Sequence, residues 1–161
     1  MKVAIVMGSK SDYPVLEKAE NMLKQFGVEY QTRIISAHRT PAAAEEFAKN
    51  AESNGFEVII AAAGKAAHLA GVLAAQTPLP VIGIPVKSDL LDGLDSLLST
   101  VQMPKGVPVA TVAVNGAENA ALLAIQMMSI KYPELRKAMV EYKENMAKEL
   151  AAIDEEFQTA K

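Results

Sequence analysis

The sequence predicts an α/β fold: a three-layer, doubly wound parallel sheet of flavodoxin-like strand order 2-1-3-4-5, followed by a long C-terminal helix. Three observations lead to this prediction. Short apolar runs rich in Val and Ile alternate with helical patterns over residues 1–130. These runs are nearly continuous in their apolar character, as expected for strands that are covered on both faces. A single helical pattern then extends from Pro133 to the end of the chain.

Strands and helices are expected to alternate along the core. The apolar runs predict strands at Val3–Met7, Tyr30–Ile35, Val58–Ala63, Val81–Ile84 and Val109–Val114. The segments that follow them predict helices at about Tyr13–Phe26, Pro41–Asn54, His68–Gln76, Leu90–Thr100 and Ala117–Ser129. Gly27 and Gly55 follow the first two helices, where a left-handed residue commonly ends a helix. Thr40 and Pro41 suit the N-cap and first turn of the second helix.

The last helix carries its apolar side chains on one stripe. They are Leu135, Met139, Tyr142, Met146, Leu150, Ile153 and Phe157, and their spacing is close to a heptad seam. A helix of ~25 residues is about 37 Å long, which exceeds the width of a small domain. It either folds back over its own sheet or packs its outer part on another subunit, and we favour the second arrangement. We therefore expect one domain over residues 1–161, with an α/β core at 1–130 and a C-terminal helix at 131–161 in oligomer contacts.

Composition narrows the classes of function. The net charge of −3 and the absence of Trp argue against a nucleic-acid surface. No stretch approaches the ~20 apolar residues that span a membrane. The chain has no cysteine, which excludes disulfides and thiolate chemistry and fits a cytoplasmic setting. Because dinucleotide, Walker, zinc-spacing and nucleophile-elbow motifs are all missing, we expect an enzyme that uses neither a metal nor a cofactor.

Three loops that follow neighbouring strands hold the residues with useful chemistry. Ligands of such sheets bind beyond the carboxyl ends of the strands. The loops are Gly8–Asp12, Ser36–Pro41 and Gly64–His68, and they contain both histidines of the chain. This coincidence predicts a site for a phosphorylated small molecule.

The first loop precedes a helix, whose free N–H groups and dipole favour a phosphate. Ser9 and Ser11 offer hydroxyl groups, although Ser11 or Asp12 could simply cap the helix. Alternatively, the Asp12 carboxylate could accept hydrogen bonds from ribose hydroxyls. The first loop is therefore a candidate for holding a ribose phosphate.

The second and third loops supply a cation and two imidazoles. Arg39 offers a planar fork of donors that matches a phosphate, and Ser36 adds a hydroxyl. His38 suits proton transfer near neutral pH, although a helix-entry histidine without a catalytic role is the alternative. The third loop has small residues that let a ligand approach the backbone. His68 alone would more often be structural, but its place beside the other loops favours a role in binding.

These segments resemble the class I N5-carboxyaminoimidazole ribonucleotide mutases (PurE) of purine biosynthesis. The matching segments are VAIVMGSKSD (Val3–Asp12), SAHRTP (Ser36–Pro41), AAHL (Ala66–Leu69), SLLSTVQMPKGVPVATVAV (Ser96–Val114) and NAALLAIQM (Asn119–Met127). The resemblance implies an isomerase that removes CO2 from N5 of the substrate and returns it to ring carbon C4. It also implies a homo-octamer with sites near subunit interfaces and a small-molecule ribonucleotide as substrate.

The resemblance also assigns roles to single residues. His38 matches the general acid/base of the family. Ser9, Asp12, Ser36 and Arg39 match residues that hold the ribose phosphate, while Gly64, Ala66, His68 and Leu69 match the loop that closes over the base and the CO2.

Two alternatives to the mutase stay open at this point. One is a class II-like aminoimidazole ribonucleotide carboxylase that uses CO2 directly, although class II relatives lack the histidine found here at His68. The other is a non-catalytic nucleotide-binding protein. Lys65 departs from the family, which commonly has Gly-Gly or Gly-Met ahead of Ala-Ala-His. We expect its ammonium to point to solvent or to a neighbouring subunit, because a cation inside a CO2 pocket would carry a desolvation cost.

Overall fold

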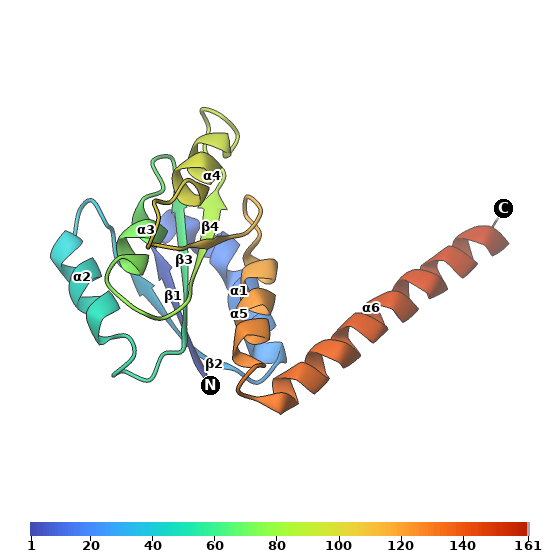
Figure 1. Ribbon diagram of the computed structural model, residues 1–161. Coiled ribbons are helices and arrows are strands. Elements are labelled where there is room, and N and C mark those ends of the chain that lie inside the picture. Colours follow the sequence, from blue (N-terminus) through green and yellow to red (C-terminus); the bar gives the residue numbers. More distant parts are fainter. Residues whose placement is uncertain (161) are drawn as a thin grey trace. The chain divides into compact units, whose positions relative to one another are not determined.

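The first unit of the protein, Met1–Ile125, is built around one parallel sheet. The computed structural model describes residues 1–160. The five strands lie in the order β2-β1-β3-β4-β5, which confirms the predicted strand order and fold class (Figure 1). They are β1 (Lys2–Met7), β2 (Glu29–Ile34), β3 (Val58–Gly64), β4 (Val81–Val86) and β5 (Ala110–Thr111).

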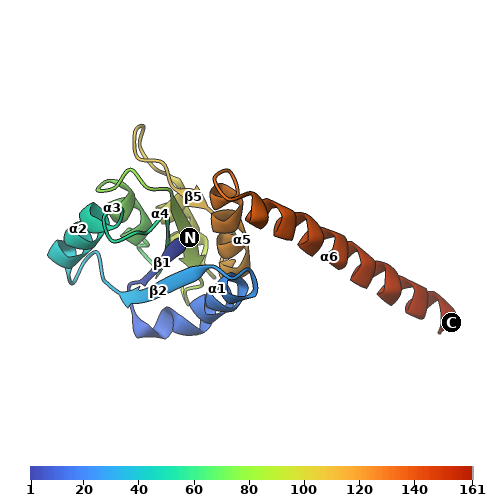
Figure 2. The ribbon, with the colours of Figure 1, turned by 90° about the horizontal axis from the view of Figure 1, so that it is seen from below.

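Helices cover the two faces of this sheet (Figure 2). The helices beside the sheet are α1 (Tyr13–Gln25), α2 (Pro41–Asn50), α3 (Leu69–Ala74), α4 (Leu94–Val101) and α5 (Ala117–Met128), and a further helix, α6 (Pro133–Thr159), belongs to the second unit. Side chains of α2 and α3 form one buried cluster with β1 and β3. On α1, Leu16, Ala19 and Leu23 are fully buried. Burial on both faces explains why β1, β3 and β4 lack the alternation of half-exposed sheets, whereas β2, at the edge of the sheet, is largely exposed.

The edges of three predicted elements, the fifth strand and the second and fourth helices, were wrong. The fifth strand covers only Ala110–Thr111 instead of Val109–Val114. Pro85 of β4 accepts a hydrogen bond from the Asn115 N–H, but it has no N–H to donate in return, so the regular ladder ends there. The fourth helix begins at Leu94 and not at Leu90, because Asp92 and Gly93 have φ values of 56° and 101°, which an α-helix does not accept.

The second helix is shorter than predicted, whereas the first ends close to its predicted position. Gly27, with a φ of 67°, directly follows the C-cap residue of α1, as predicted. Gly55 also has a positive φ, 80°, but it closes the turns that follow α2 and does not end the helix itself. The second helix ends at Asn50, four positions earlier than expected, and a short 3-10 turn, η1 (Lys10–Asp12), precedes α1. Thr40 occupies the N-cap position of α2 without capping it. Its hydroxyl instead donates to the Ser36 carbonyl and accepts from the Ser36 N–H, which closes the loop that carries His38.

The second unit begins at Gln126 and consists mainly of α6. This helix is 27 residues long, which confirms the predicted long C-terminal helix. Its outer apolar side chains are exposed; they are Val140, Met146, Leu150, Ile153 and Phe157. Within residues 1–160, no helix combines the length and the apolar character needed to cross a membrane.

Candidate active site

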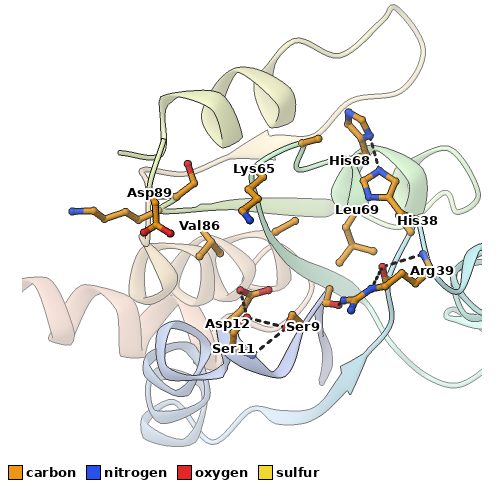
Figure 3. Close-up of a pocket in the computed structure, with 18 residues that line it drawn as sticks. Ser9, Ser11, Asp12, His38, Arg39, Lys65, His68, Leu69, Val86 and Asp89 are labelled. Atoms are coloured by element: carbon orange, nitrogen blue, oxygen red, sulfur yellow. Dashed lines mark hydrogen bonds between the residues drawn. The ribbon is translucent and has the colours of Figure 1, made fainter. Parts of the chain in front are cut away.

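A cavity of about 540 Å³ lies beyond the carboxyl ends of β1, β2, β3 and β4 (Figure 3). The parallel sheet places these ends at one edge, so the loops that follow them meet there. All of the site residues predicted from the sequence line this cavity: Ser9, Ser11, Asp12, Ser36, His38, Arg39, Gly64, Ala66, His68 and Leu69. The structure therefore brings together residues that are up to 60 positions apart in the chain.

Ser9 organises the first loop. Its backbone is extended and its Oγ accepts hydrogen bonds from the N–H and the hydroxyl of Ser11, at 3.3 and 2.8 Å. Ser9, and not Ser11 or Asp12, is thus the residue whose side chain caps the turn. Both bonds use Ser9 as an acceptor, so its own hydroxyl hydrogen remains available for a ligand.

Asp12 lies at the N-cap position of α1, but its side chain makes no capping bond there. Burial raises the pKa of the Asp12 carboxyl above its ordinary value. Hydrogen bonds from the Ser11 side chain and the Ser9 backbone, together with the charge of Arg39, act in the opposite direction. Because the Asp12 carboxylate makes no capping bond to the helix, it can accept hydrogen bonds from a ligand in the cavity.

Arg39 connects the second loop to the first. Its backbone N–H and its Nε donate to Ser36 Oγ at 3.2 and 3.3 Å, and one terminal nitrogen donates to the Gly8 carbonyl at 2.6 Å. These bonds fix the guanidinium plane and leave its other N–H groups unused. A second hollow of about 300 Å³ begins at this point and is lined by Gly8, Ser9, Lys10, Ile34, Ser36, Arg39 and Thr40. Hydroxyl donors and cations therefore surround one end of the site.

The two histidines are in direct contact. His38 Nε2 lies 2.8 Å from His68 Nδ1, and the rings meet edge to face at 84° with centroids 4.9 Å apart (Figure 3). One of the two facing nitrogens must donate and the other must accept, so a single proton lies between them. Two imidazolium rings would place two donors face to face. The pair therefore holds at most one positive charge in this geometry, and either ring can stabilise the protonated form of the other.

The third loop is compact where it faces β4. A Cβ added to Gly64 would lie 3.3 Å from the Val86 carbonyl oxygen, so glycine allows the close approach of these strand ends. The next residue, Lys65, has a φ of 57°. Residues other than Gly, Asn and Asp seldom adopt this left-handed backbone conformation. Its side chain is exposed, as expected, but it lines the cavity and does not point away from it (Figure 3).

Sequence reasoning missed the fourth wall of the cavity. It is formed by Val86, the last residue of β4, and by Lys87, Ser88 and Asp89, which follow it. The Ser88 hydroxyl donates to the Asp95 carboxylate at 2.7 Å, and the Asp92 carboxylate beside Lys87, at 2.6 Å, raises the pKa of that ammonium. The predicted strand order already placed the fourth strand beside the third. Applying the same carboxyl-end rule to one more strand would have found these residues.

Comparisons with known proteins agree on one family. The family model described as AIR carboxylase matches residues 2–149, a range that includes the whole cavity lining. The N5-carboxyaminoimidazole ribonucleotide mutase of Pyrococcus abyssi is 59% identical over 145 residues, which cover 90% of this chain and 83% of that protein. The mutase of Thermotoga maritima is 58% identical over 149 residues, covering 92% and 87%. The crystal structure of Treponema denticola PurE superposes with a TM-score of 0.88 at 33% identity, covering 96% of this chain and 97% of that chain.

Proposed function

This chain belongs to the AIR carboxylase family, and from that premise we propose that it converts N5-carboxyaminoimidazole ribonucleotide to 4-carboxy-5-aminoimidazole ribonucleotide in purine biosynthesis. The reaction is an isomerisation: the carboxyl group leaves N5 as CO2 and returns to ring carbon C4. The observation that carries this proposal is the His38–His68 contact in a cavity that Arg39 and several serine hydroxyls also line. Arg39 and the serines can hold a phosphate while the histidine pair moves a proton.

Arg39, Ser36 and Ser9 bind the phosphate of the ribonucleotide. The guanidinium is already oriented by Ser36 Oγ and the Gly8 carbonyl, so little side-chain entropy is lost when an anion binds its remaining N–H groups. The Ser9 hydroxyl supplies a further donor, supported by Ser11. The Asp12 carboxylate accepts from the ribose hydroxyls. Together these contacts fix the substrate and bring its base to the histidines.

His38 carries the proton in both half-reactions. As an imidazolium it protonates N5 while the N5–carboxyl bond breaks, which releases neutral CO2 and leaves the free amine of aminoimidazole ribonucleotide. Carbon C4 then bonds to the CO2 carbon, and the proton that C4 loses returns to His38. No proton is gained or lost overall, and His38 ends in its starting form. His68 accepts or donates the hydrogen bond that orients this ring.

The third loop retains the CO2 between the two half-reactions. A neutral, volatile intermediate cannot be held by charge, so it must be enclosed. Gly64, Ala66 and Leu69 line the cavity beside His68 and offer small or apolar surfaces for this purpose.

The assembly proposed for the working enzyme is a cytoplasmic homo-octamer with sites near its interfaces. Large apolar side chains are exposed on and before α4, next to the cavity wall: Leu90, Leu91, Leu94, Leu98 and Val101. Exposed apolar surface of this extent is typical of protein contacts. Light scattering on the full chain measures the mass of the assembly, and a monomer at micromolar concentration would contradict the proposal.

A comparison of two substrates tests the proposed reaction against the direct carboxylase. We expect the purified chain to convert N5-carboxyaminoimidazole ribonucleotide in buffer without bicarbonate. We expect aminoimidazole ribonucleotide to react only when bicarbonate is added at high concentration, because free CO2 must then enter the site from solution. Formation of product is followed by its ultraviolet absorbance. Turnover that depends on bicarbonate with both substrates would contradict the mutase and support the carboxylase.

A further inference from the structure

Lys65 occupies a conformation that is unfavourable for its side chain. Its φ of 57° lies in the left-handed region, where a Cβ approaches the backbone. The turn itself is well defined, because the Ala67 N–H donates to the Lys65 carbonyl at 2.9 Å and the His68 N–H donates to the Ala66 carbonyl at 2.8 Å. A glycine would satisfy this backbone without strain. The lysine at this position therefore calls for an explanation outside the fold.

Lys65 is also the cationic side chain of the cavity that has no partner among the described residues. Three cationic side chains line it: Arg39, Lys65 and Lys87. Arg39 donates to Ser36 and Gly8, and Lys87 forms an ion pair with Asp92. Within residues 1–160, the Lys65 ammonium has neither an ion pair nor a hydrogen bond. Figure 3 shows its side chain extending into the pocket, away from the Arg39 end.

Because the proposed substrate carries two anionic groups, we propose that Lys65 binds its carboxylate, both as the N5 carbamate and as the C4 carboxylate of the product. This inference rests on the proposed function. Arg39 and the serines hold the phosphate at one end. Lys65 lies three residues before His68, whose ring contacts His38. The migrating carboxyl group must come within reach of that histidine pair, and Lys65 lines the same cavity as both histidines.

The proposed contact between the Lys65 ammonium and the bound ribonucleotide is strong only while the migrating group is a charged carboxylate. Substrate and product are carboxylates, and each gains a charge-assisted hydrogen bond from the ammonium. The intermediate state holds neutral CO2 and an uncharged base, so the contact weakens there. Lys65 therefore raises the affinity for carboxylated ribonucleotides and leaves the affinity for aminoimidazole ribonucleotide unchanged. Since Lys65 is exposed in the free protein, its ammonium stays hydrated until a carboxylate replaces the water.

Replacement of Lys65 by Asn tests this assignment, because Asn removes the charge and tolerates a positive φ. We expect the dissociation constant of the product carboxylate to rise about tenfold, the loss of one hydrogen bond to a charged group. We expect that of aminoimidazole ribonucleotide to change less than about twofold, since it lacks the carboxylate. In turnover, KM should rise and kcat should not fall, because the contact weakens as the carboxyl group becomes neutral CO2. Lys65→Arg, which keeps the charge, should bind the product nearly as the native chain does.

Calorimetry on the full chain measures both dissociation constants, and Lys18→Gln, on the exposed face of α1, is the control for removal of one positive charge. Unchanged product binding in Lys65→Asn would overturn the inference. So would an equal loss of affinity for both ribonucleotides, which would show that Lys65 acts through general electrostatics or loop structure. Because binding is measured without turnover, a native chain that binds product through Lys65 but does not isomerise it refutes only the proposed function. A native chain that binds neither ribonucleotide refutes both.

Discussion

Replacing His38 by Asn is expected to lower kcat by about a thousandfold, within the range that a positioned acid/base contributes. Asparagine is polar and fits the space, but it cannot gain or lose a proton near neutral pH. Both half-reactions need that proton, first at N5 and then from C4. The phosphate contacts of Arg39 and Ser36 are untouched, so the dissociation constant of the product should change by less than about threefold. Steady-state rates and calorimetry on the same preparation measure both quantities.

His68→Asn is the matched variant for this experiment. It removes the ring that contacts His38 Nε2 at 2.8 Å, but it leaves the proposed proton carrier in place. We expect a smaller loss of kcat than in His38→Asn, because an orienting hydrogen bond contributes less than the proton transfer itself. Equal melting temperatures exclude a loss of folding as the cause. Native turnover in His38→Asn would contradict the mechanism, and a larger loss in His68→Asn would exchange the roles of the two rings.

Replacing Arg39 by Ala is expected to weaken binding of the ribonucleotide by about a hundredfold, which corresponds to about 2.7 kcal/mol. The change removes the donors that face the phosphate and also the bonds to Ser36 Oγ and the Gly8 carbonyl that hold the two loops together. Because the group binds substrate and product alike, KM should rise far more than kcat falls. Arg39→Lys should recover only part of the affinity, since an ammonium lacks the planar fork.

Arg33→Ala provides the control for the Arg39 variant. Arg33 is exposed on β2, with its guanidinium carbon 6.0 Å from the centre of the Phe47 ring, and it does not line the cavity. The same substitution there should leave KM within about twofold of the native value, because a surface charge contributes little. If Arg33→Ala weakened binding as much as Arg39→Ala, the effect would reflect net charge and not a phosphate contact.

The sequence predicted the strand order and the three loops because both follow from local patterns. Continuous apolar runs identified the buried strands β1, β3 and β4, and the carboxyl-end rule then collected His38, Arg39 and His68 into one site. The shortened fifth strand depends on a tertiary detail, the missing N–H of Pro85 opposite the chain at Asn115. The late start of α4 depends on the left-handed residues Asp92 and Gly93, which a helical pattern does not reveal.

The sequence predicted which loops meet at the site better than it predicted which side-chain atoms contact one another. That His38 and His68 would lie near each other followed from the topology, but the 2.8 Å contact depends on the rotamers of both rings. The capping role of Ser9, in place of Ser11 or Asp12, depends on the short turn at Lys10–Asp12 that precedes α1. The inward direction of Lys65 depends on its left-handed backbone. Each of these details is set by a few dihedral angles that the pattern of apolar residues does not constrain.

The central claim is that the carboxyl group which leaves N5 is the same one that arrives at C4. It is tested most directly with N5-carboxyaminoimidazole ribonucleotide that carries carbon-13 in its carbamate, mixed with excess enzyme in unlabelled bicarbonate. Carbon-13 NMR of the product reports the origin of its carboxylate. A cavity that encloses the CO2 beside His38 predicts a product whose C4 carboxylate retains the label. A product diluted to the isotopic composition of the buffer would contradict it.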